Sequence, residues 1–227
     1  MAEQEPNRPK IVLTKAVQIA FILLEYLESR WKDTTARAQG DKLLIPVYWE
    51  ILNKNHSQTH RTYHNWNHIH SLLKLSQKFK SELENPTMVD YAIFYHDAIY
   101  IPKRNNNEEK SALLAKQHLE KIDSTYATKV ATMILATKKH ELSQDHDTNF
   151  LLDFDLAIIG SPWLDYERYT QHIRKEYSIY PDFLYRPGRK KVLQSFLDQS
   201  HIFKTELFQA QYEHQARLNI QREINTI

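Results

Sequence analysis

The chain has 227 residues, of which 41% are hydrophobic and 26% are charged, and its net charge is only +2. This length suits one large domain with a full core, and so small a net charge provides no general field for binding nucleic acid. Cysteine is absent, which excludes disulfides, thiolate ligands and cysteine nucleophiles, so any bound metal must be held by nitrogen and oxygen atoms.

The apolar residues recur every three to four positions, and the three glycines are too few for a sheet-rich fold or a glycine-rich phosphate loop. We therefore predict an all-α protein, a single-domain helical bundle. The bundle would comprise residues 10–205, and a C-terminal helix, residues 206–227, would either pack on it or form an oligomer contact. The predicted helices, in chain order, cover residues 12–31, 43–53, 65–83, 87–99, 107–122, 125–140, 149–159, 164–177, 181–199 and 204–225.

Two histidines stand out at the start of the predicted helix 65–83. His68 lies within the apolar arc of this helix, beside Leu72. A lone histidine on such a face is more often a hydrogen-bonded core residue than a metal ligand. However, His64 lies one turn earlier, and histidines four residues apart align on one face of a helix, as a shared metal ion requires.

A His-Asp pair interrupts the predicted helix 87–99. The stretch YAIFYHDAIY is apolar almost all round, which predicts burial, and His96 and Asp97 lie in its middle. Aspartate is costly in a core unless it is paired. The two side chains either pair with each other or a buried arginine, or they bind a metal ion.

A further aspartate is predicted to be buried in helix 149–159. Asp155 projects near the centre of the apolar arc, whereas Asp153 projects near its opposite edge. We therefore expect Asp155 to be buried and Asp153 to be solvated. A buried carboxylate needs a cation or several hydrogen-bond donors.

Two more ionisable residues face inward near helix ends. Glu108 projects onto the inner face of helix 107–122 and Glu109 does not, although both could be capping residues of a helix N-terminus. His140 ends helix 125–140, where the helix dipole alone favours an imidazolium. The last helices carry residues that either form an amphipathic outer layer or place basic groups in a phosphate pocket: Arg168, Tyr169, Arg174, Tyr177, Tyr180, Tyr185 and Arg186.

Together, these helices offer nitrogen and oxygen ligands suited to a divalent ion. The order of residues resembles the HD superfamily of metal-dependent phosphohydrolases, which has a histidine, a His-Asp doublet and a distant aspartate on helices of one bundle. The matching residues are His68, His96-Asp97 and Asp155. The chain is similar, over about residues 10–205, to a bacterial subgroup of predicted metal-dependent HD phosphohydrolases in five stretches: RTYHNWNHI, FYHDAIY, NNEEKSA, ATKKH and LLDFDLAIIG.

This resemblance implies hydrolysis of a phosphomonoester or phosphodiester, nucleotides included, with one or two divalent ions of Mn, Fe, Ni, Co, Mg or Zn. The implied ligands are His68, His96, Asp97 and Asp155, with His64 as an additional one. Asp97 would bridge the ion and the attacking water. The other implied catalytic residues are Glu108 as a general acid or base, His140 as a second ligand or phosphate-neutralising group, and Arg61, with Lys138, as a phosphate contact. One departure is visible, because Ile101-Pro102 stands where the subgroup often has an acidic residue.

Two other hypotheses remain at this stage. The same fold could be a non-catalytic metal or nucleotide sensor, or a helical scaffold in which His96 and Asp97 only pair inside the core. A small phosphorylated molecule is the expected partner, with no strong signal for nucleic acid, and a homodimer is open. No segment reaches the ~18 apolar residues of a membrane span and residues 1–10 lack the apolar core of a signal peptide, so we expect a cytoplasmic protein.

Overall fold

The computed structural model describes residues 14–227, and in this range all regular structure is helical. The predicted all-α class and single bundle are confirmed. The helices, in chain order, are α1 (Lys15–Thr35), α2 (Leu44–His56), α3 (Trp66–Lys78), η1 (Lys80–Glu82), α4 (Pro86–Tyr95), α5 (Asn107–Ile122), α6 (Ser124–Ala136), α7 (His146–Leu156), η2 (Ala157–Gly160), α8 (Trp163–Glu176), α9 (Asp182–Leu197), α10 (Glu206–Phe208), η3 (Gln209–Glu213) and α11 (His214–Thr226).

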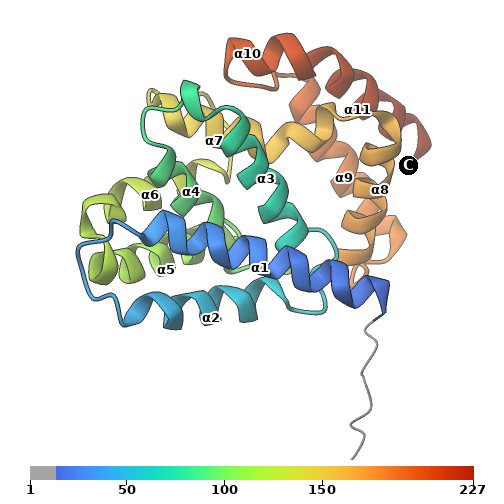
Figure 1. Cartoon of the computed structure of the whole chain (residues 1–227). Coiled ribbons are helices and arrows are strands. Elements are labelled where there is room, and N and C mark those ends of the chain that lie inside the picture. The colour runs from blue at the N-terminus through green and yellow to red at the C-terminus, as the bar shows by residue number, and fades with distance from the viewer. Residues whose placement is uncertain (1–13) are drawn as a thin grey trace, which may run out of the picture.

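Helix α4 is the centre of the bundle. It packs against α1, α3, α5, α6 and α7, and every residue from Met88 to Tyr95 is buried. Its apolar sequence therefore finds a neighbour on every side, as an all-round apolar helix requires. Figure 1 shows α1 and α2 running side by side below this core, with α8, α9 and α11 gathered on the far side of α3.

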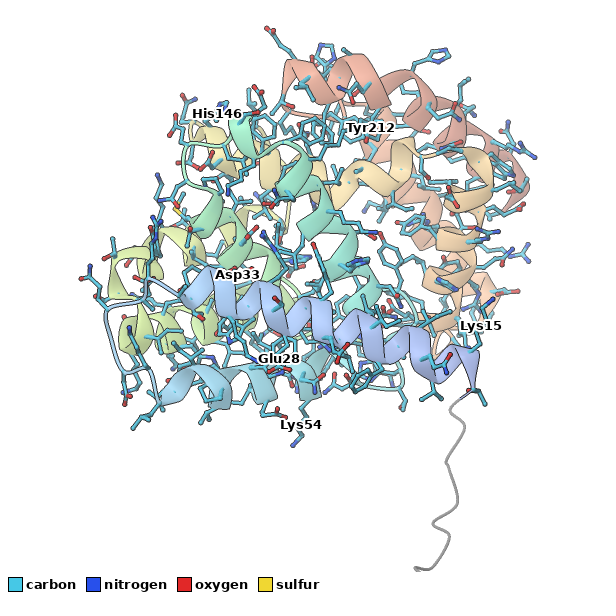
Figure 2. The ribbon with its side chains drawn as sticks, viewed as in Figure 1. Lys15, Glu28, Asp33, Lys54, His146 and Tyr212 are labelled. Atoms are coloured by element: carbon cyan, nitrogen blue, oxygen red, sulfur yellow. The ribbon has the colours of Figure 1, made fainter. Side chains whose placement is uncertain are left out.

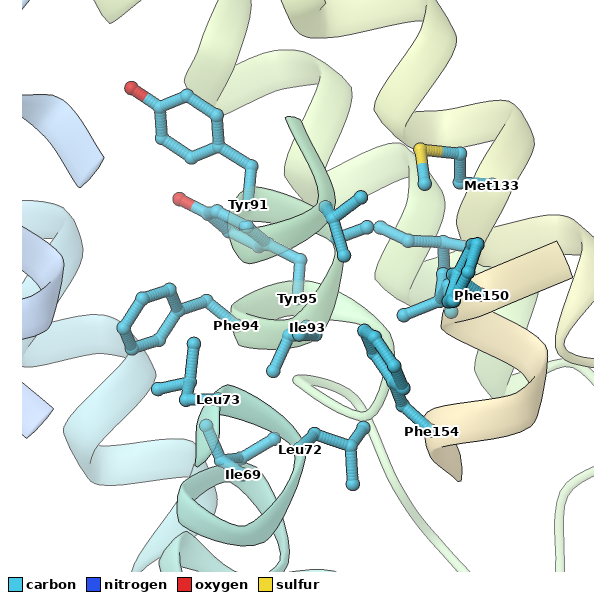
Figure 3. Packing of buried hydrophobic residues seen from close by; sticks show 14 of the residues in the cluster. Ile69, Leu72, Leu73, Tyr91, Ile93, Phe94, Tyr95, Met133, Phe150 and Phe154 are labelled. Carbon is cyan, nitrogen blue, oxygen red and sulfur yellow. The ribbon is translucent and has the colours of Figure 1, made fainter. Parts of the chain in front are cut away.

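Large side chains from α3, α4, α6 and α7 fill the core between these helices (Figure 3). Ile69 and Leu73 of α3 meet Phe94 of α4, and Phe154 of α7 closes the cluster. Fully burying one such side chain contributes about 1.5–3 kcal/mol. The core thereby fixes the relative positions of α3, α4 and α7, the helices that carry the candidate ligands.

Several predicted helices end earlier in the structure, and two of these ends lie at the candidate site. Helix α4 stops at Tyr95 rather than at residue 99, so the His-Asp doublet lies at its C-terminal end. Helix α6 stops at Ala136, and His140 lies in the following turn with φ 50°. In both places the residues after the helix end make contacts with distant parts of the chain instead of helical hydrogen bonds. These contacts hold the side chains of the candidate site.

The prediction that Asp155 is buried and Asp153 solvated is wrong, because the Asp155 side chain is 17% exposed and that of Asp153 is fully buried. Asp153 accepts hydrogen bonds from the backbone N–H of Lys204 (2.6 Å) and from the N–H and hydroxyl of Thr205 (2.8 and 2.7 Å). Burial raises the pKa of Asp153 to about 6 against the effect of these donors. The face of α7 opposite the core is covered by the chain entering α10, which a projection of α7 alone does not reveal.

The C-terminal residues pack against the body of the protein. Asn219 of α11 donates to the carbonyls of Ile159 and Ser161, both at 2.8 Å. Tyr212, labelled in Figure 2, lies so close to Gly160 that a Cβ atom there would come within 2.7 Å of it, which explains the glycine. None of the described helices is long and apolar enough to cross a membrane.

Candidate metal centre

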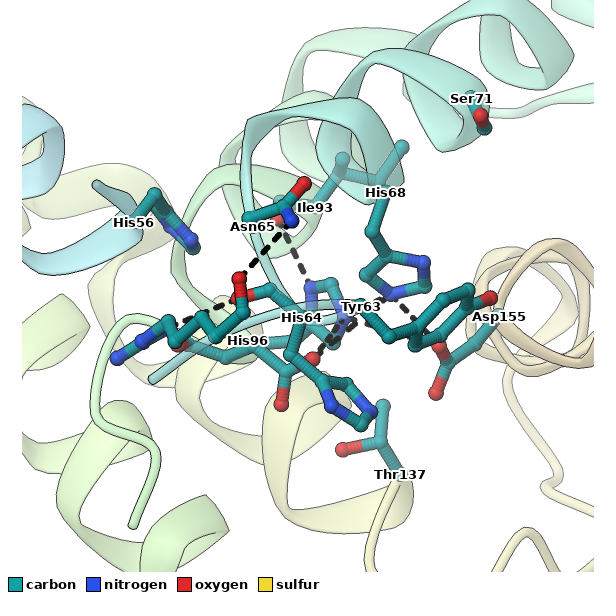
Figure 4. Close-up of polar contacts among 12 residues, drawn as sticks. His56, Tyr63, His64, Asn65, His68, Ser71, Ile93, His96, Thr137 and Asp155 are labelled. Atoms are coloured by element: carbon teal, nitrogen blue, oxygen red, sulfur yellow. Dashed lines mark hydrogen bonds and ion pairs between the residues drawn. The ribbon is translucent and has the colours of Figure 1, made fainter. Parts of the chain in front are cut away.

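Four side chains from three helical regions lie close together. Figure 4 labels three of them, His68, His96 and Asp155. The Nε2 atoms of His68, from α3, and His96, after α4, lie 3.1 Å apart. Asp155 Oδ1, from α7, lies 3.1 Å from the Nε2 of His68 and 3.7 Å from that of His96. Asp97 Oδ2 lies 3.2 Å from the Nε2 of His96 and 3.7 Å from that of His68. The predicted quartet is therefore a spatial cluster.

The donor atoms of this cluster fit a cation. His96 Nδ1 lies 2.9 Å from the carbonyl of Ile93, which can only accept, so Nδ1 carries a proton and Nε2 of the neutral ring keeps its lone pair. That lone pair faces a second imidazole and two carboxylates. These lone pairs and negative charges repel one another unless a positive charge lies between them. Nitrogen and oxygen atoms at these positions suit a divalent ion.

The pKa shifts of His96 and Asp155 also indicate that the cluster favours a positive charge. Burial disfavours an imidazolium, but the carboxylates of Asp97 and Asp155 outweigh it and raise the pKa of His96 to about 9. Burial also acts to raise the pKa of Asp155, and hydrogen bonds from His140 and His68 hold it well below its usual range. The cluster thus attracts one positive charge, which a proton or a metal ion can supply.

The two kinds of candidate ligand differ in how exposed their side chains are. The side chains of His68 and His96 are 2% and 1% exposed, whereas those of Asp97 and Asp155 are 15% and 17% exposed. The imidazoles are therefore locked in the core, and the carboxylates reach toward solvent. Ligands arranged in this way leave one side of a bound ion open to water or to a substrate.

Arg61 holds the backbone at the His96-Asp97 doublet. It is 4% exposed, and its guanidinium donates to the carbonyls of Asp97 (2.5 Å) and Ala98 (3.0 Å) and to the side chain of Gln58 (3.1 Å). These bonds hold the carbonyls of the residues that follow the end of α4 in a non-helical arrangement. They support a positioning role for Arg61, in place of the phosphate contact expected from the sequence.

The remaining predicted residues surround the cluster. His140 Nε2 lies 3.0 Å from Asp155 Oδ2, and its left-handed backbone is a strain of about 1 kcal/mol that is typical of functional sites. Glu108 is half-buried and lines the same pocket as Asp97. Lys138 pairs with Glu109 and donates to the Asn105 carbonyl (2.7 Å), so its ammonium group is already partnered.

His64 is held by a glutamate that we did not select from the sequence. Glu176 of α8 is 3% exposed and accepts hydrogen bonds from the backbone N–H groups of Tyr63 (2.7 Å) and His64 (2.9 Å) and from His64 Nδ1 (2.6 Å). The His64 ring also stacks on Tyr100 at 4.2 Å. A signal existed, because Glu176 shares the buried face of α8 with Tyr166 and Ile173.

A pocket of about 640 Å³ opens beside the cluster. Asp97, Asp155, Glu108, His64 and His140 line it from the α3–α7 side. A second cavity of about 460 Å³ lies against His68 and shares Asp155 with the first. The carboxylates of the cluster are therefore reachable from a space large enough for a small molecule.

The opposite side of this pocket comes from α8, α9 and the turn between them. The basic residues we had considered for a phosphate pocket do not line it, because Arg168 pairs with Asp165, and Arg174 and Arg186 pair with Asp182. The aromatic residues of the same segment do line it: Tyr169, Tyr177, Tyr180 and Tyr185.

Comparisons of the chain with protein-family models, with curated proteins and with solved structures found no match. The case for a function therefore depends on the chemistry of the site. Its strongest element is the convergence of His68, His96 and Asp155, whose donor atoms lie within 4.8 Å of one another.

Proposed function

We propose that the protein is a metal-dependent phosphohydrolase of the HD type, with a divalent ion held by His68, His96, Asp97 and Asp155. The observation that carries the proposal is the meeting of two buried imidazole nitrogens and two partly exposed carboxylates at the edge of a large pocket. A divalent ion bound there supplies a Lewis acid and lowers the pKa of a bound water toward about 7.

The surrounding residues have separate roles in this proposal. Asp97, at the pocket side of the cluster, orients the attacking water, and Arg61 holds the backbone on which Asp97 stands. His140 and Asp155 share a hydrogen bond, so His140 can hold a proton beside the reacting phosphate. Glu108 is placed to exchange a proton with water or the leaving group from the same pocket.

His64 completes the pocket side of the site. Its Nδ1 is bonded to Glu176, so the tautomer is set and Nε2 is the nitrogen available to the pocket. That nitrogen can donate to a phosphate oxygen or bind a second ion. The scaffold hypothesis explains a His96–Asp97 pair but offers no reason for His68 and Asp155 to join it.

The test is a measurement of metal content and turnover on the same purified protein. We expect bound divalent metal, and phosphatase or phosphodiesterase activity on a substrate panel that is supplied in turn with Mn, Fe, Ni, Co, Mg and Zn. Asp97→Ala should lose both properties, while Asp165→Ala, at a surface position, should keep them.

Each rival hypothesis has its own outcome in this experiment. Activity that survived Asp97→Ala would contradict the proposed mechanism. Metal or nucleotide binding without turnover of any phosphate ester would favour the sensor. A protein that binds no metal at all would favour the scaffold.

A further inference from the structure

The large pocket has two chemically different sides. The side supplied by α3–α7 carries the carboxylates and imidazoles of the metal centre. The other side, which we call the tyrosine wall, is supplied by α8, α9 and the turn between them. The wall consists of Tyr169, Tyr177, Tyr180, Leu184, Tyr185 and Val192.

Aromatic rings connect the metal centre to this wall. His64 stacks on Tyr100, whose hydroxyl lies 3.3 Å from that of Tyr177. The Tyr177 ring in turn lies 6.2 Å from the rings of both Tyr180 and Tyr185. Such a surface offers ring faces and edges to a flat or apolar group, with a few hydroxyls to orient it.

The apolar residues of the wall are unusually open. Leu184 is 55% exposed and Val192 is 48% exposed, although both line the pocket. Burying such side chains against a ligand is favourable because it removes apolar surface from water. The pocket volume, about 640 Å³, lies within the range of small-molecule sites and far exceeds the size of a phosphate ion.

The pocket has few positive charges to offer a polyanion. Among residues 14–227, its lining includes only Lys138 and Arg189 as lysine or arginine, and Lys138 is paired with Glu109. Arg189 makes two bonds to Glu223, at 2.8 and 3.0 Å, and its side chain is 10% exposed. Sites for several phosphates need free cations or guanidinium forks, which this lining does not provide.

The wall is also uncharged at neutral pH. Burial raises the pKa of Tyr185 to about 12, and burial also raises that of Tyr177. A second phosphate placed against these rings would therefore lose its hydration without gaining a counter-charge, which is unfavourable.

We propose that the substrate carries a single phosphate on a bulky, uncharged aromatic or apolar group, with the phosphate at the metal centre and that group against the tyrosine wall. This inference rests on the proposed phosphohydrolase function and narrows its substrate class. It excludes inorganic polyphosphates and highly charged polyphosphate esters as preferred substrates.

Calorimetric titration of the manganese-loaded protein tests the inference through affinity, with the steady heat flow of any hydrolysis separated from the heat of binding. The probes are 1-naphthyl phosphate, glycerol phosphate, inorganic phosphate and tripolyphosphate. We expect 1-naphthyl phosphate to bind at least about tenfold more tightly than each of the others, because only it places a large apolar group on the wall.

A matched pair of variants on α9 locates the binding site. A Cβ atom at Gly188 would meet no other atom within 4 Å, and Gly188 lines the pocket on α9, so Gly188→Phe adds a bulky side chain on that side of the pocket. This variant should weaken the binding of 1-naphthyl phosphate at least about tenfold and leave the affinity for inorganic phosphate unchanged. Lys190→Phe, on the exposed surface of the same helix, should change neither.

The possible results separate two kinds of failure. If inorganic phosphate binds but 1-naphthyl phosphate gains nothing over it, or tripolyphosphate binds best, the substrate class is wrong and the phosphohydrolase proposal stands. If Gly188→Phe weakens both ligands equally, the tyrosine wall is not the binding surface. If no phosphate compound binds the manganese-loaded protein, the proposed function fails, and this inference fails with it.

Discussion

The helices on the two sides of the large pocket differ in how much of their length is buried. On the metal side, α4 buries every residue from Met88 to Tyr95. On the other side, α9 buries only Leu193 and exposes Phe183 and Leu184. Metal ligands must be held to within tenths of an ångström by packed neighbours, whereas a surface for an organic group needs only suitable side chains. The protein thus combines a densely packed side, where we propose a metal ion binds, with a lightly packed side, where we propose the substrate's organic group binds.

The difference in packing between the two sides should have its largest effect on the free energy of unfolding. Phe154 is 1% exposed at the centre of the core, so Phe154→Ala should lower the free energy of unfolding by about 3–5 kcal/mol. Phe183, 74% exposed on α9, is the matched control, and Phe183→Ala should change it by less than about 0.5 kcal/mol. Urea unfolding of the two variants measures both values, and similar losses would remove the contrast between the two sides.

The metal side should be intolerant of ligand loss. His96→Ala removes a nearly buried nitrogen and leaves Asp97 and Asp155 facing each other without it, so bound metal should be lost and activity should fall more than about 100-fold. His172→Ala, at an exposed position of α8, should have no such effect. Elemental analysis and initial rates make this comparison. Full metal content in His96→Ala would show that His96 is not a ligand.

Glu176 links the two sides, because it lies on α8 and holds His64. In Glu176→Gln the amide N–H₂ cannot accept the Nδ1 proton of His64, so we expect kcat to fall about 10- to 100-fold with the KM and metal content retained. Glu167→Gln on the same helix is the control. Steady-state kinetics with thermal unfolding separate the possibilities, since a purely structural role would lower stability and leave the kcat of the folded fraction intact.

The smallest expected effect is a pH dependence of the free energy of unfolding, caused by His56 on the densely packed side. Burial, aided by the charge of Arg61, lowers the pKa of His56 from 6.5 to about 3. The unfolded chain therefore binds a proton that the folded protein does not, and stability falls as the pH drops below about 6.5. Between pH 7 and pH 5.5 this group should cost about 1 kcal/mol of unfolding free energy.

His56→Gln removes that titration and should flatten the dependence of stability on pH over this interval. Urea unfolding at the two pH values gives the comparison, with His201→Gln, at an exposed position, as the control. An unchanged slope in His56→Gln would mean that His56 is not the neutral buried group that its environment indicates.

The helical class, and the choice of His68, His96, Asp97 and Asp155 as residues that lie close together, could be predicted from local sequence patterns. A run that is apolar all round, such as that of α4, has to be buried, and an ionisable pair in it needs a partner. The ends of the helices could not be predicted in this way. Helix α4 stops where Arg61, far away in sequence, binds the carbonyls of Asp97 and Ala98.

Asp153 and Glu176 show the limit more sharply. A projection of α7 identifies one apolar face, but Asp153 is buried by the backbone of Lys204 and Thr205, fifty-one and fifty-two positions later. Glu176 lies 112 residues from the His64 side chain that it holds. Contacts over such distances depend on how the helices pack, which the pattern of one helix does not contain.

The most direct test of the central claim is anomalous scattering from crystals grown with manganese or zinc. A metal peak is predicted about 2 Å from the Nε2 atoms of His68 and His96 and from a carboxylate oxygen of Asp155. No peak at this position, or full occupancy only at another histidine such as the exposed His146, would contradict the metal centre and the function proposed from it.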